Sequence, residues 1–367
     1  MKQFMRLCLD LAEKYRGYTS PNPMVGAIVV KDNKIVGKGV HKKAGAPHAE
    51  VVALEEAGKL AKGSTLFVNL EPCSHFGRTP PCTEKIISSG IKSVIIAMKD
   101  PNPKIHGKGI TKLQENGINV NVGICENEAK MLNEIYIKHI TTCKPFVILK
   151  LAITLDGKIA SYTGNSKWIS NEQSRKKVHQ LRNTVDAILI GKKTLLRDNP
   201  KLNVRFVDKI KNPRKIILTN SLDIQPEKIK KMEVYKLSNE KPLIMVGILN
   251  QKNQQQKKKL ENIGIEIILI NKTGNELNLE ELLRELGKRE ITSLIIEGGS
   301  QVYTSFLKAN LIDKAYFFLS PKIIGEEGLK WIGKLGSKRV EDSIQLKNIK
   351  FNNYGDNIQI SGYFNQI

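Results

Sequence analysis

The side chains best suited to chemistry lie near the N-terminus. His48 and Glu50 are separated by one residue, and Cys73 and Cys82 follow. Histidine and cysteine are preferred zinc ligands, and three protein ligands leave one coordination position open to water, as in catalytic zinc sites. Zinc lowers the pKa of such a water toward about 7. The pattern predicts a zinc-dependent hydrolytic deaminase in which Glu50 carries the proton from water to the leaving amine.

A zinc site that only stabilises the fold is the alternative. His75 and His106 are available as a fourth ligand, and four protein ligands would close the coordination sphere. Asn22 is a candidate for binding the substrate, or it satisfies the backbone of its own turn. The side chains of His41 and His75 either line the same pocket or lie on the surface, and Arg78 either binds a phosphate or is solvated.

The spacing of the cysteines narrows the class of deaminase. Eight residues separate Cys73 from Cys82, whereas two are usual in cytidine and tRNA deaminases. The longer form, EPCSHFGRTPPC, resembles the deaminase half of bacterial riboflavin-biosynthesis enzymes of the RibD/RibG family. The segments PNPMVGAIVV (21–30) and DPNPKIHGKGI (100–110) are similar to the same family. This resemblance implies a cytidine-deaminase-like three-layer α/β/α domain.

A second signal lies far along the chain. The apolar segment 292–297 leads into Gly298, Gly299 and Ser300, which open a helical segment. A strand, a glycine turn and a helix place free N–H groups and a positive helix end at one point, which suits a phosphate. Taken alone the signal is weak, because two glycines after a strand often form only a tight turn.

Three further segments resemble the reductase half of the same family: KLAITLDGKIA (150–160), GNSKWIS (164–170) and DAILIGKKTLLRDNPKLNVR (186–205). The resemblance implies a dihydrofolate-reductase-like α/β domain that uses NADPH. The implied NADPH contacts are Ala152, Trp168, Thr194, Asp198, Gly299, Ser300, Gln301, Val302, Tyr303, Thr304 and Ser305. The implied contacts to a phosphoribosyl substrate are Ser166, Arg182, Leu202, Arg205 and Glu297.

The residue types suit these roles. Arg182 and Arg205 can hold a 5′-phosphate through charge-assisted hydrogen bonds, and Glu297 can accept hydrogen bonds from ribose hydroxyls. Hydride transfer belongs to the nicotinamide, so the protein supplies position and a proton. Lys150 and Asp198 are the candidate catalytic proton donors. The alternative for Lys150 is a solvated strand end.

The elements that position these residues form two alternating series of strands and helices. The first begins with an amphipathic helix and two adjacent strands at 24–30 and 34–40, and it ends with a helix at 126–140. Lys144-Pro145 breaks that helix, and the second series starts there. We therefore expect a deaminase domain at 1–144 and a reductase domain at 145–367.

Composition excludes some classes. The 367 residues contain no apolar run of the ~20 residues needed to cross a bilayer. With no signal-peptide pattern at the N-terminus, we expect a cytoplasmic protein without membrane partners. Five cysteines at irregular spacing do not suggest a disulfide framework. The net charge of +23 suits nucleic acid or anionic small molecules, but the lysines are scattered.

The prediction is a bifunctional riboflavin-biosynthesis enzyme that uses zinc and NADPH on phosphorylated pyrimidines. The alternative is a nucleic-acid base deaminase with a fused accessory domain, which the positive charge favours slightly. A non-catalytic regulator that binds metal and nucleotide is a third reading, which Glu50 disfavours. The resemblance also implies a homo-oligomer, either a dimer or a tetramer.

Overall fold

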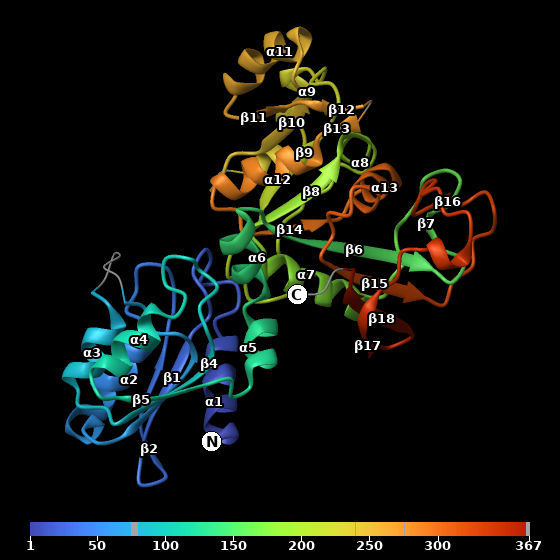
Figure 1. Cartoon of the computed structure of the whole chain (residues 1–367). Coiled ribbons are helices and arrows are strands. Elements are labelled where there is room, and N and C mark those ends of the chain that lie inside the picture. The colour runs from blue at the N-terminus through green and yellow to red at the C-terminus, as the bar shows by residue number, and fades with distance from the viewer. Residues whose placement is uncertain (75–79, 239, 275, 365–367) are drawn as a thin grey trace. The chain divides into compact units, whose positions relative to one another are not determined.

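The computed structural model describes residues 1–74, 80–238, 240–274 and 276–364 (Figure 1). The chain divides into two compact units, of which the first ends at Cys143 and the second begins at Lys144. Among the described residues, no helix is both long and apolar enough to cross a membrane.

The first unit is built on one mixed sheet. Its strands are β1 (Gly26–Lys31), β2 (Lys34–Val40), β3 (Thr65–Leu70), β4 (Ser93–Met98) and β5 (Asn119–Val122). They lie in the order β2-β1-β3-β4-β5, with β1 antiparallel to β2 and β3, and the last three parallel. Asp32 and Asn33 make the tight turn between β1 and β2, both at positive φ.

Helices cover both faces of this sheet. They are α1 (Lys2–Glu13), α2 (Ala49–Ala57), α3 (Cys82–Ser88), α4 (Lys108–Glu115), α5 (Glu126–Leu132) and α6 (Glu134–Thr142). A Cβ added to Gly26 would lie 2.2 Å from the Cys8 carbonyl oxygen in α1, and one on Gly39 1.9 Å from the Ala49 carbonyl oxygen in α2. Gly39 pairs with Ala27, the neighbour of Gly26, so the two glycines point to opposite faces. The unit is therefore a three-layer α/β/α fold.

The expected single helix at 126–140 is two helices, α5 and α6, which meet at Asn133. The side chain of Asn133 is buried, accepts a hydrogen bond from the Met24 N–H (2.8 Å) and donates one to the Met24 carbonyl (3.0 Å). A distant backbone group therefore determines where the helix breaks, which local periodicity does not reveal.

The second unit contains a nine-stranded sheet. Its strands are β6 (Phe146–Thr154), β8 (Ala187–Gly191), β9 (Arg214–Leu218), β10 (Ile244–Ile248), β11 (Glu266–Ile270), β14 (Ser293–Ile296), β15 (Lys314–Ser320), β17 (Lys347–Tyr354) and β18 (Asn357–Tyr363). The order is β11-β10-β9-β8-β14-β6-β15-β18-β17, parallel from β11 to β15 and antiparallel beyond. The carboxyl ends of the parallel strands meet at one edge, where open α/β sheets bind ligands.

Helices and short strands complete the second unit. The helices are α7 (Glu172–Thr184), α8 (Lys192–Asp198), α9 (Pro226–Lys230), α10 (Glu233–Lys236), α11 (Gln251–Glu261), α12 (Leu279–Lys288) and α13 (Ser300–Lys308). The short strands pair as β7 (Lys158–Ala160) with β16 (Leu329–Lys330), and β12 (Lys272–Thr273) with β13 (Glu276–Leu277). The strand β15 ends at Ser320, because Pro321 cannot donate to a ladder.

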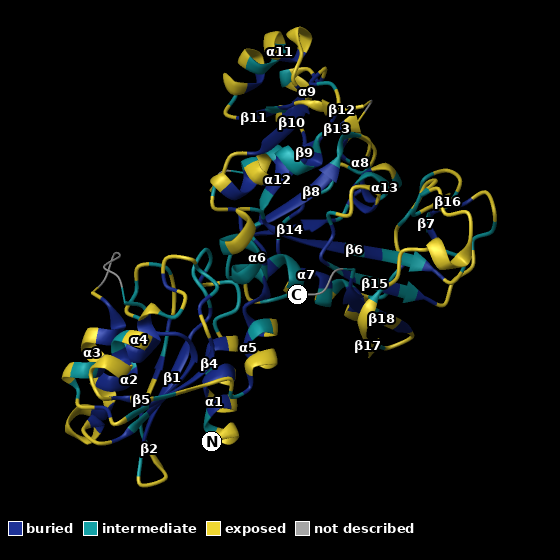
Figure 2. Cartoon of the chain, viewed as in Figure 1, coloured by how far each residue is buried: buried dark blue, intermediate teal, exposed yellow. Residues whose placement is uncertain are grey.

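Each unit has its own apolar core. Figure 2 shows the central strands of both sheets buried, whereas α11 is largely exposed. The first core includes Ile28, Leu66 and Ile96, and the second includes Leu149 and Leu294. Because burial of apolar side chains dominates folding free energy, each sheet has its own source of stability.

Candidate active sites

Three ligand atoms converge in the first unit. His48 lies directly before α2, Cys82 is the first residue of α3, and Cys73 follows β3. Their ligand atoms all lie within 4.8 Å of one another, with His48 Nδ1 3.0 Å from Cys82 Sγ and 3.6 Å from Cys73 Sγ. One imidazole and two thiols form a donor set that zinc prefers, so these residues fit a zinc ion. The backbone N–H of Cys82 also donates to Cys73 Sγ (3.3 Å), which fixes that sulfur.

Glu50 lies in the first turn of α2, with its side chain buried beside these sulfurs. Burial and the negative charge of a Cys73 thiolate raise the pKa of Glu50, the charge of His48 lowers it, and the resulting pKa is about 7. A buried carboxyl group at this position, next to the three ligand atoms, is placed to take up and release a proton.

Asn22 and His41 also lie at this site. Asn22 Nδ2 donates to His41 Nε2 (3.0 Å), and His41 Nδ1 then donates to the Pro47 carbonyl (3.2 Å). The ring of His41 meets the ring of His48 edge-on, with centroids 5.5 Å apart. Asn22 is therefore connected to the ligand cluster through His41, and its amide nitrogen is already engaged.

His75 and His106 are the residues that the sequence offers as a fourth zinc ligand. His106 is not part of the ligand cluster, and its Nδ1 hydrogen-bonds the Asp100 carbonyl (3.0 Å). His75 and Arg78 lie outside the described residues.

Sequence reasoning missed Glu71, which precedes Pro72 and Cys73. Its buried carboxylate accepts four backbone N–H bonds of 3.0 to 3.3 Å from the segment that leads into α4. The donors are Asp100, Gly107, Gly109 and Ile110. Glu71 therefore ties the loop that carries Cys73 to the start of α4. Because the partners are backbone groups 29 to 39 residues away, no local pattern marks this role.

The second unit contains a cavity of about 330 Å³ at the carboxyl edge of its sheet. Ten of the residues implied by the resemblance line it: Ala152, Ser166, Trp168, Arg182, Thr194, Asp198, Arg205, Glu297, Gly299 and Tyr303. Lys150, the other candidate proton donor, lines it as well. The remaining implied residues do not line it: Leu202, Ser300, Gln301, Val302, Thr304 and Ser305. Leu202 and Val302 are buried, and Thr304 Oγ1 accepts a hydrogen bond from the Gly333 N–H (2.8 Å).

A buried ion pair lies at the centre of the cavity wall. Arg182 binds Glu297 through two parallel hydrogen bonds (2.7 and 2.8 Å), and its Nη1 donates to the Asn203 carbonyl (3.2 Å). Lys150 Nζ lies 3.7 Å from Glu297. Burial raises the pKa of Glu297, but the charges of Arg182 and Lys150 outweigh burial and hold it at about 2. Burial lowers the pKa of Lys150.

Other predicted residues have defined partners. The Trp168 ring is 60% exposed, so it is not packed in a core, and the Arg175 guanidinium lies over it at 4.4 Å. Asp198 is paired with Arg197 (2.7 Å). Gly299, at φ +63, precedes α13, so its conformation suits the glycine that the sequence places there.

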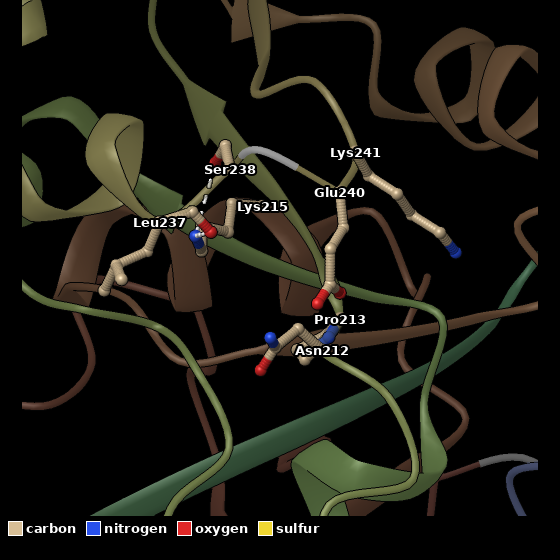
Figure 3. Close-up of a pocket in the computed structure, with 7 residues that line it drawn as sticks. All are labelled: Asn212, Pro213, Lys215, Leu237, Ser238, Glu240 and Lys241. Carbon is tan, nitrogen blue, oxygen red and sulfur yellow. Dashed lines mark hydrogen bonds between the residues drawn. The ribbon is translucent and has the colours of Figure 1, made fainter.

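A second hollow, of about 10 Å³, lies beside Lys215 in β9 (Figure 3). It has room for about one water molecule. Lys215 is buried, its Nζ donates to the carbonyls of Val234 and Leu237 and to Ser238 Oγ, and burial lowers its pKa to about 8. We assign this lysine to the stability of the fold.

Both halves match known families. Residues 1–98 match the cytidine and deoxycytidylate deaminase zinc-binding region, and residues 145–360 match the RibD C-terminal domain. The zinc ligand set on a three-layer fold, followed by a reductase unit, defines a bifunctional deaminase and reductase. The chain is 47% identical to riboflavin biosynthesis protein RibD of Aquifex aeolicus (98% of this chain, 97% of that protein). The chain belongs to the RibD family of riboflavin-biosynthesis enzymes.

Other relatives agree over the whole length. RibD of Escherichia coli is 35% identical, over 94% of each chain. The structure of Acinetobacter baumannii RibD superposes with a TM-score of 0.88 at 32% identity (99% of this chain, 98% of that chain). The TM-score is 0.83, at 37% identity and with the same coverage, for the structure of a Thermotoga maritima diaminohydroxyphosphoribosylaminopyrimidine deaminase/5-amino-6-(5-phosphoribosylamino)uracil reductase.

These matches confirm the predicted fold class, the bifunctional enzyme and the cofactors zinc and NADPH. The alternative, a nucleic-acid base deaminase with an accessory domain, explains neither the long cysteine spacing nor the match of the second half.

Proposed function

We propose that the chain catalyses two successive reactions. The first removes the 2-amino group of 2,5-diamino-6-ribosylamino-4(3H)-pyrimidinone 5′-phosphate as ammonia. The second reduces the ribosyl chain and yields 5-amino-6-ribitylamino-2,4(1H,3H)-pyrimidinedione 5′-phosphate. The observation that carries the proposal is the cluster of His48, Cys73 and Cys82 beside the buried Glu50, on the same chain as the cationic cavity.

In the deaminase site, His48, Cys73 and Cys82 would hold zinc, which supplies a Lewis acid that activates water. Glu50 would take a proton from the attacking water and deliver it to the amine that leaves. Asn22 would orient the pyrimidine or its ribose with the part of its amide that His41 does not use. The oxygen of water ends on the ring carbon, and the amino group leaves as ammonia.

In the reductase site, NADPH supplies hydride to the sugar C1 and the chain supplies position and a proton. Lys150 is the stronger candidate for the donor, since its side chain is mostly buried beside Glu297. Asp198 is the weaker one, because its carboxylate is paired with Arg197. Arg205 would bind the 5′-phosphate, whereas Arg182 would mainly hold Glu297 for the ribose hydroxyls.

The remaining contacts are assigned as the resemblance implies. Those proposed for the substrate are Ser166 and Leu202, and those proposed for NADPH are Ala152, Trp168, Thr194, Asp198 and the segment 299–305. The cavity lining supports Ser166, Ala152, Trp168, Thr194, Asp198, Gly299 and Tyr303.

The decisive experiment pairs two variants, Glu50→Gln and Arg205→Ala. With the diaminopyrimidine substrate and NADPH, the wild-type enzyme releases ammonia and oxidises NADPH. Glu50→Gln keeps zinc and loses ammonia release by about 100-fold or more, since a general acid–base contributes at least that factor. It still oxidises NADPH when it is given the deaminated intermediate. Arg205→Ala shows the reverse pattern. A wild-type enzyme that yields neither signal contradicts the proposed substrate.

We further propose domain limits of 1–144 and 145–367, a cytoplasmic location, and a homo-oligomer, either a dimer or a tetramer. Support for an oligomer comes from β17, the outermost strand of its sheet, on which Ile349 and Phe351 are exposed. Light scattering on the purified enzyme measures the assembly directly, and a monomeric mass at working concentration contradicts it.

A further inference from the structure

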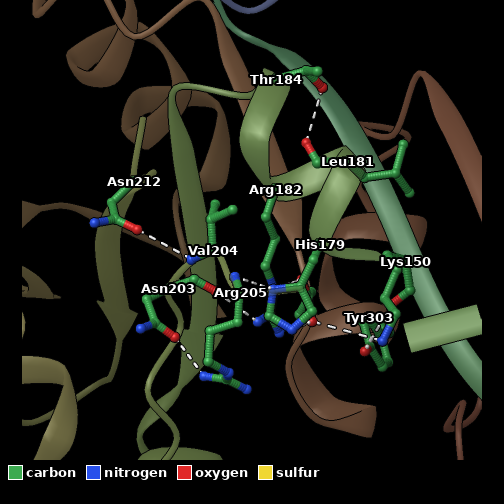
Figure 4. Close-up of polar contacts among 11 residues, drawn as sticks. Lys150, His179, Leu181, Arg182, Thr184, Asn203, Val204, Arg205, Asn212 and Tyr303 are labelled. Carbon is green, nitrogen blue, oxygen red and sulfur yellow. Dashed lines mark hydrogen bonds and ion pairs between the residues drawn. The ribbon is translucent and has the colours of Figure 1, made fainter. Parts of the chain in front are cut away.

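His179 occupies an unassigned place in the cavity wall. It lies on α7, one turn before Arg182, and its ring is buried but lines the cavity. The ring meets Phe206 edge-on, with centroids 5.0 Å apart. In Figure 4 it is drawn between Arg205 and Lys150. A polar ring in this position either serves the surrounding protein or contacts a ligand.

One ring nitrogen is engaged with the backbone. The N–H of Arg205 donates to His179 Nδ1 (2.9 Å). An acceptor nitrogen carries no proton, so the imidazole is neutral and its proton lies on Nε2. Burial lowers the pKa of His179 to about 4, and the charges of Arg182 and Arg205 lower it in the same direction. The ring therefore presents a single donor, Nε2–H.

That donor has no partner among the described residues. Fully buried side-chain polar atoms that lack a partner there are Thr83 Oγ1, His139 Nδ1, Ser320 Oγ and Gln359 Oε1. His179 Nε2 is not one of them, so it reaches the open space of the cavity that the ring lines.

The loop that His179 holds is strained. Leu202 and Phe206 both have positive φ (+48° and +66°), which costs about 1 kcal/mol or more for each bulky residue. Hydrogen bonds hold the loop in this form, from Arg182 to the Asn203 carbonyl and from the Arg205 N–H to His179. The second of these fixes the backbone of the residue proposed to bind phosphate.

The charge of the cavity points to the ligand group. Its lining contains five cationic side chains, Lys150, Arg175, Arg182, Arg197 and Arg205, and two anionic ones, Asp198 and Glu297. The guanidinium of Arg182 is committed to Glu297 and Asn203, whereas that of Arg205 donates only through Nη1, to Asn203, among the described residues. Arg205 and His179 are thus adjacent donors with hydrogen atoms to spare, which suits the oxygens of a phosphate.

We propose that His179 is a substrate-binding residue of the reductase site, which donates from Nε2 to a phosphate oxygen of the phosphoribosyl group and holds the Arg205 loop through Nδ1. The inference rests on the proposed function of this cavity. In this proposal Nε2 binds the ligand and Nδ1 supports the loop. Two substitutions of His179 distinguish the two roles.

In His179→Asn, the amide oxygen replaces Nδ1 as acceptor for the Arg205 N–H, but nothing replaces Nε2–H. We expect the unfolding midpoint to stay near that of the wild type. The KM for the deaminated intermediate should rise about tenfold, as for loss of one hydrogen bond to a charged group, while the KM for NADPH changes little. In His179→Gln, the amide nitrogen reaches the Nε2 position, so most of the substrate KM is recovered, but the Nδ1 contact is lost and the unfolding midpoint falls.

Nitrogen NMR of the histidine-labelled enzyme supplies a readout without turnover. The wild-type spectrum should show the Nε2 resonance of a neutral ring that carries its proton on Nε2. The absence of this resonance in His179→Asn assigns it to His179. It should shift when D-ribose 5-phosphate is added but not when D-ribose is added. A shift without NADPH oxidation would leave the inference intact and contradict the proposed function. An unchanged substrate KM in His179→Asn, or equal losses in both variants for substrate and NADPH, would overturn the inference.

Discussion

At the scale of single residues, the reductase cavity depends on one buried carboxylate. Glu297 neutralises Arg182 and lies near Lys150, and side chains of all three are mostly buried. A buried charge that loses its partner is costly, whereas a pair that keeps both partners contributes little net stability. The function of this pair is therefore to fix the geometry of the cavity wall.

Replacement of Glu297 by Gln should destabilise the second unit by about 3–5 kcal/mol, because two buried cations lose their counter-ion. Chemical denaturation monitored by fluorescence measures the change. The matched control is Asp198→Asn, which breaks a more exposed pair with Arg197 and should cost at most about 1 kcal/mol. Equal effects of the two substitutions would show that Glu297 is not a buried counter-ion.

Acid should destabilise the second unit in two steps. His179 has its pKa lowered to about 4 in the folded state, so the unfolded chain binds more protons between pH 6.5 and 4 and stability falls as the pH falls through that window. Glu297, with a folded pKa of about 2, adds a loss between about pH 4.5 and 2. Thermal unfolding measured across this pH range tests whether the two losses of stability occur in this order. In His179→Asn the first step should disappear, and its persistence would assign that step to other groups.

At the scale of elements, glycines in β2 set the position of the deaminase machinery. Helix α2 carries Glu50 and follows His48, and it lies against Gly37 and Gly39 with no room for a side chain. A Cβ at Gly37 would be 2.1 Å from the Ala53 carbonyl oxygen, closer than atoms approach. The helix can take its place only because the strand presents bare backbone there.

Gly39→Ala should therefore displace α2 and lower deaminase activity and zinc content together, with a loss of stability of about 1–3 kcal/mol from overpacking. The reductase activity, measured on the deaminated intermediate, should persist. Lys38→Ala is the control, since this neighbouring side chain is exposed. An active Gly39→Ala enzyme with full zinc content would mean that the sheet accommodates the methyl group.

Sequence patterns predicted most of these elements, but not their contacts. The strand predicted at 34–40 has the observed limits, because alternation and β-branched runs are local signals. The helix α11 was missed, since only Asn253 and Leu260 of its residues are buried and no apolar period marks it. The partners of Glu71 and of His179 Nδ1 come from distant parts of the chain, so no spacing rule reveals them.

At the scale of the whole molecule, the deaminase site and the reductase site lie in different structural units. The zinc ligands lie in the first unit with its own core, and the cavity lies in the second. Five of the cationic side chains of this positively charged chain line that cavity. The two activities should therefore be separable by chemical treatment as well as by mutation.

Removal of zinc with a chelator should abolish ammonia release and leave NADPH oxidation of the deaminated intermediate unchanged. The reason is that none of the three ligands lines the reductase cavity. Both rates are measured on the same sample before and after dialysis, and zinc is then restored as a control. A parallel fall of both rates, reversed by zinc, would show that the units depend on each other.

The hydrogen bonds that Glu71 accepts should slow the exchange of backbone amide protons with solvent. The amides of Gly107, Gly109 and Ile110 lie at the end of a loop or in the first turn of α4, where no helical partner is available and exchange with solvent is normally fast. Each instead donates to a buried carboxylate. In deuterium oxide these protons should persist as long as those of the central strands, so that the end of this loop and the first turn of α4 exchange as slowly as the core.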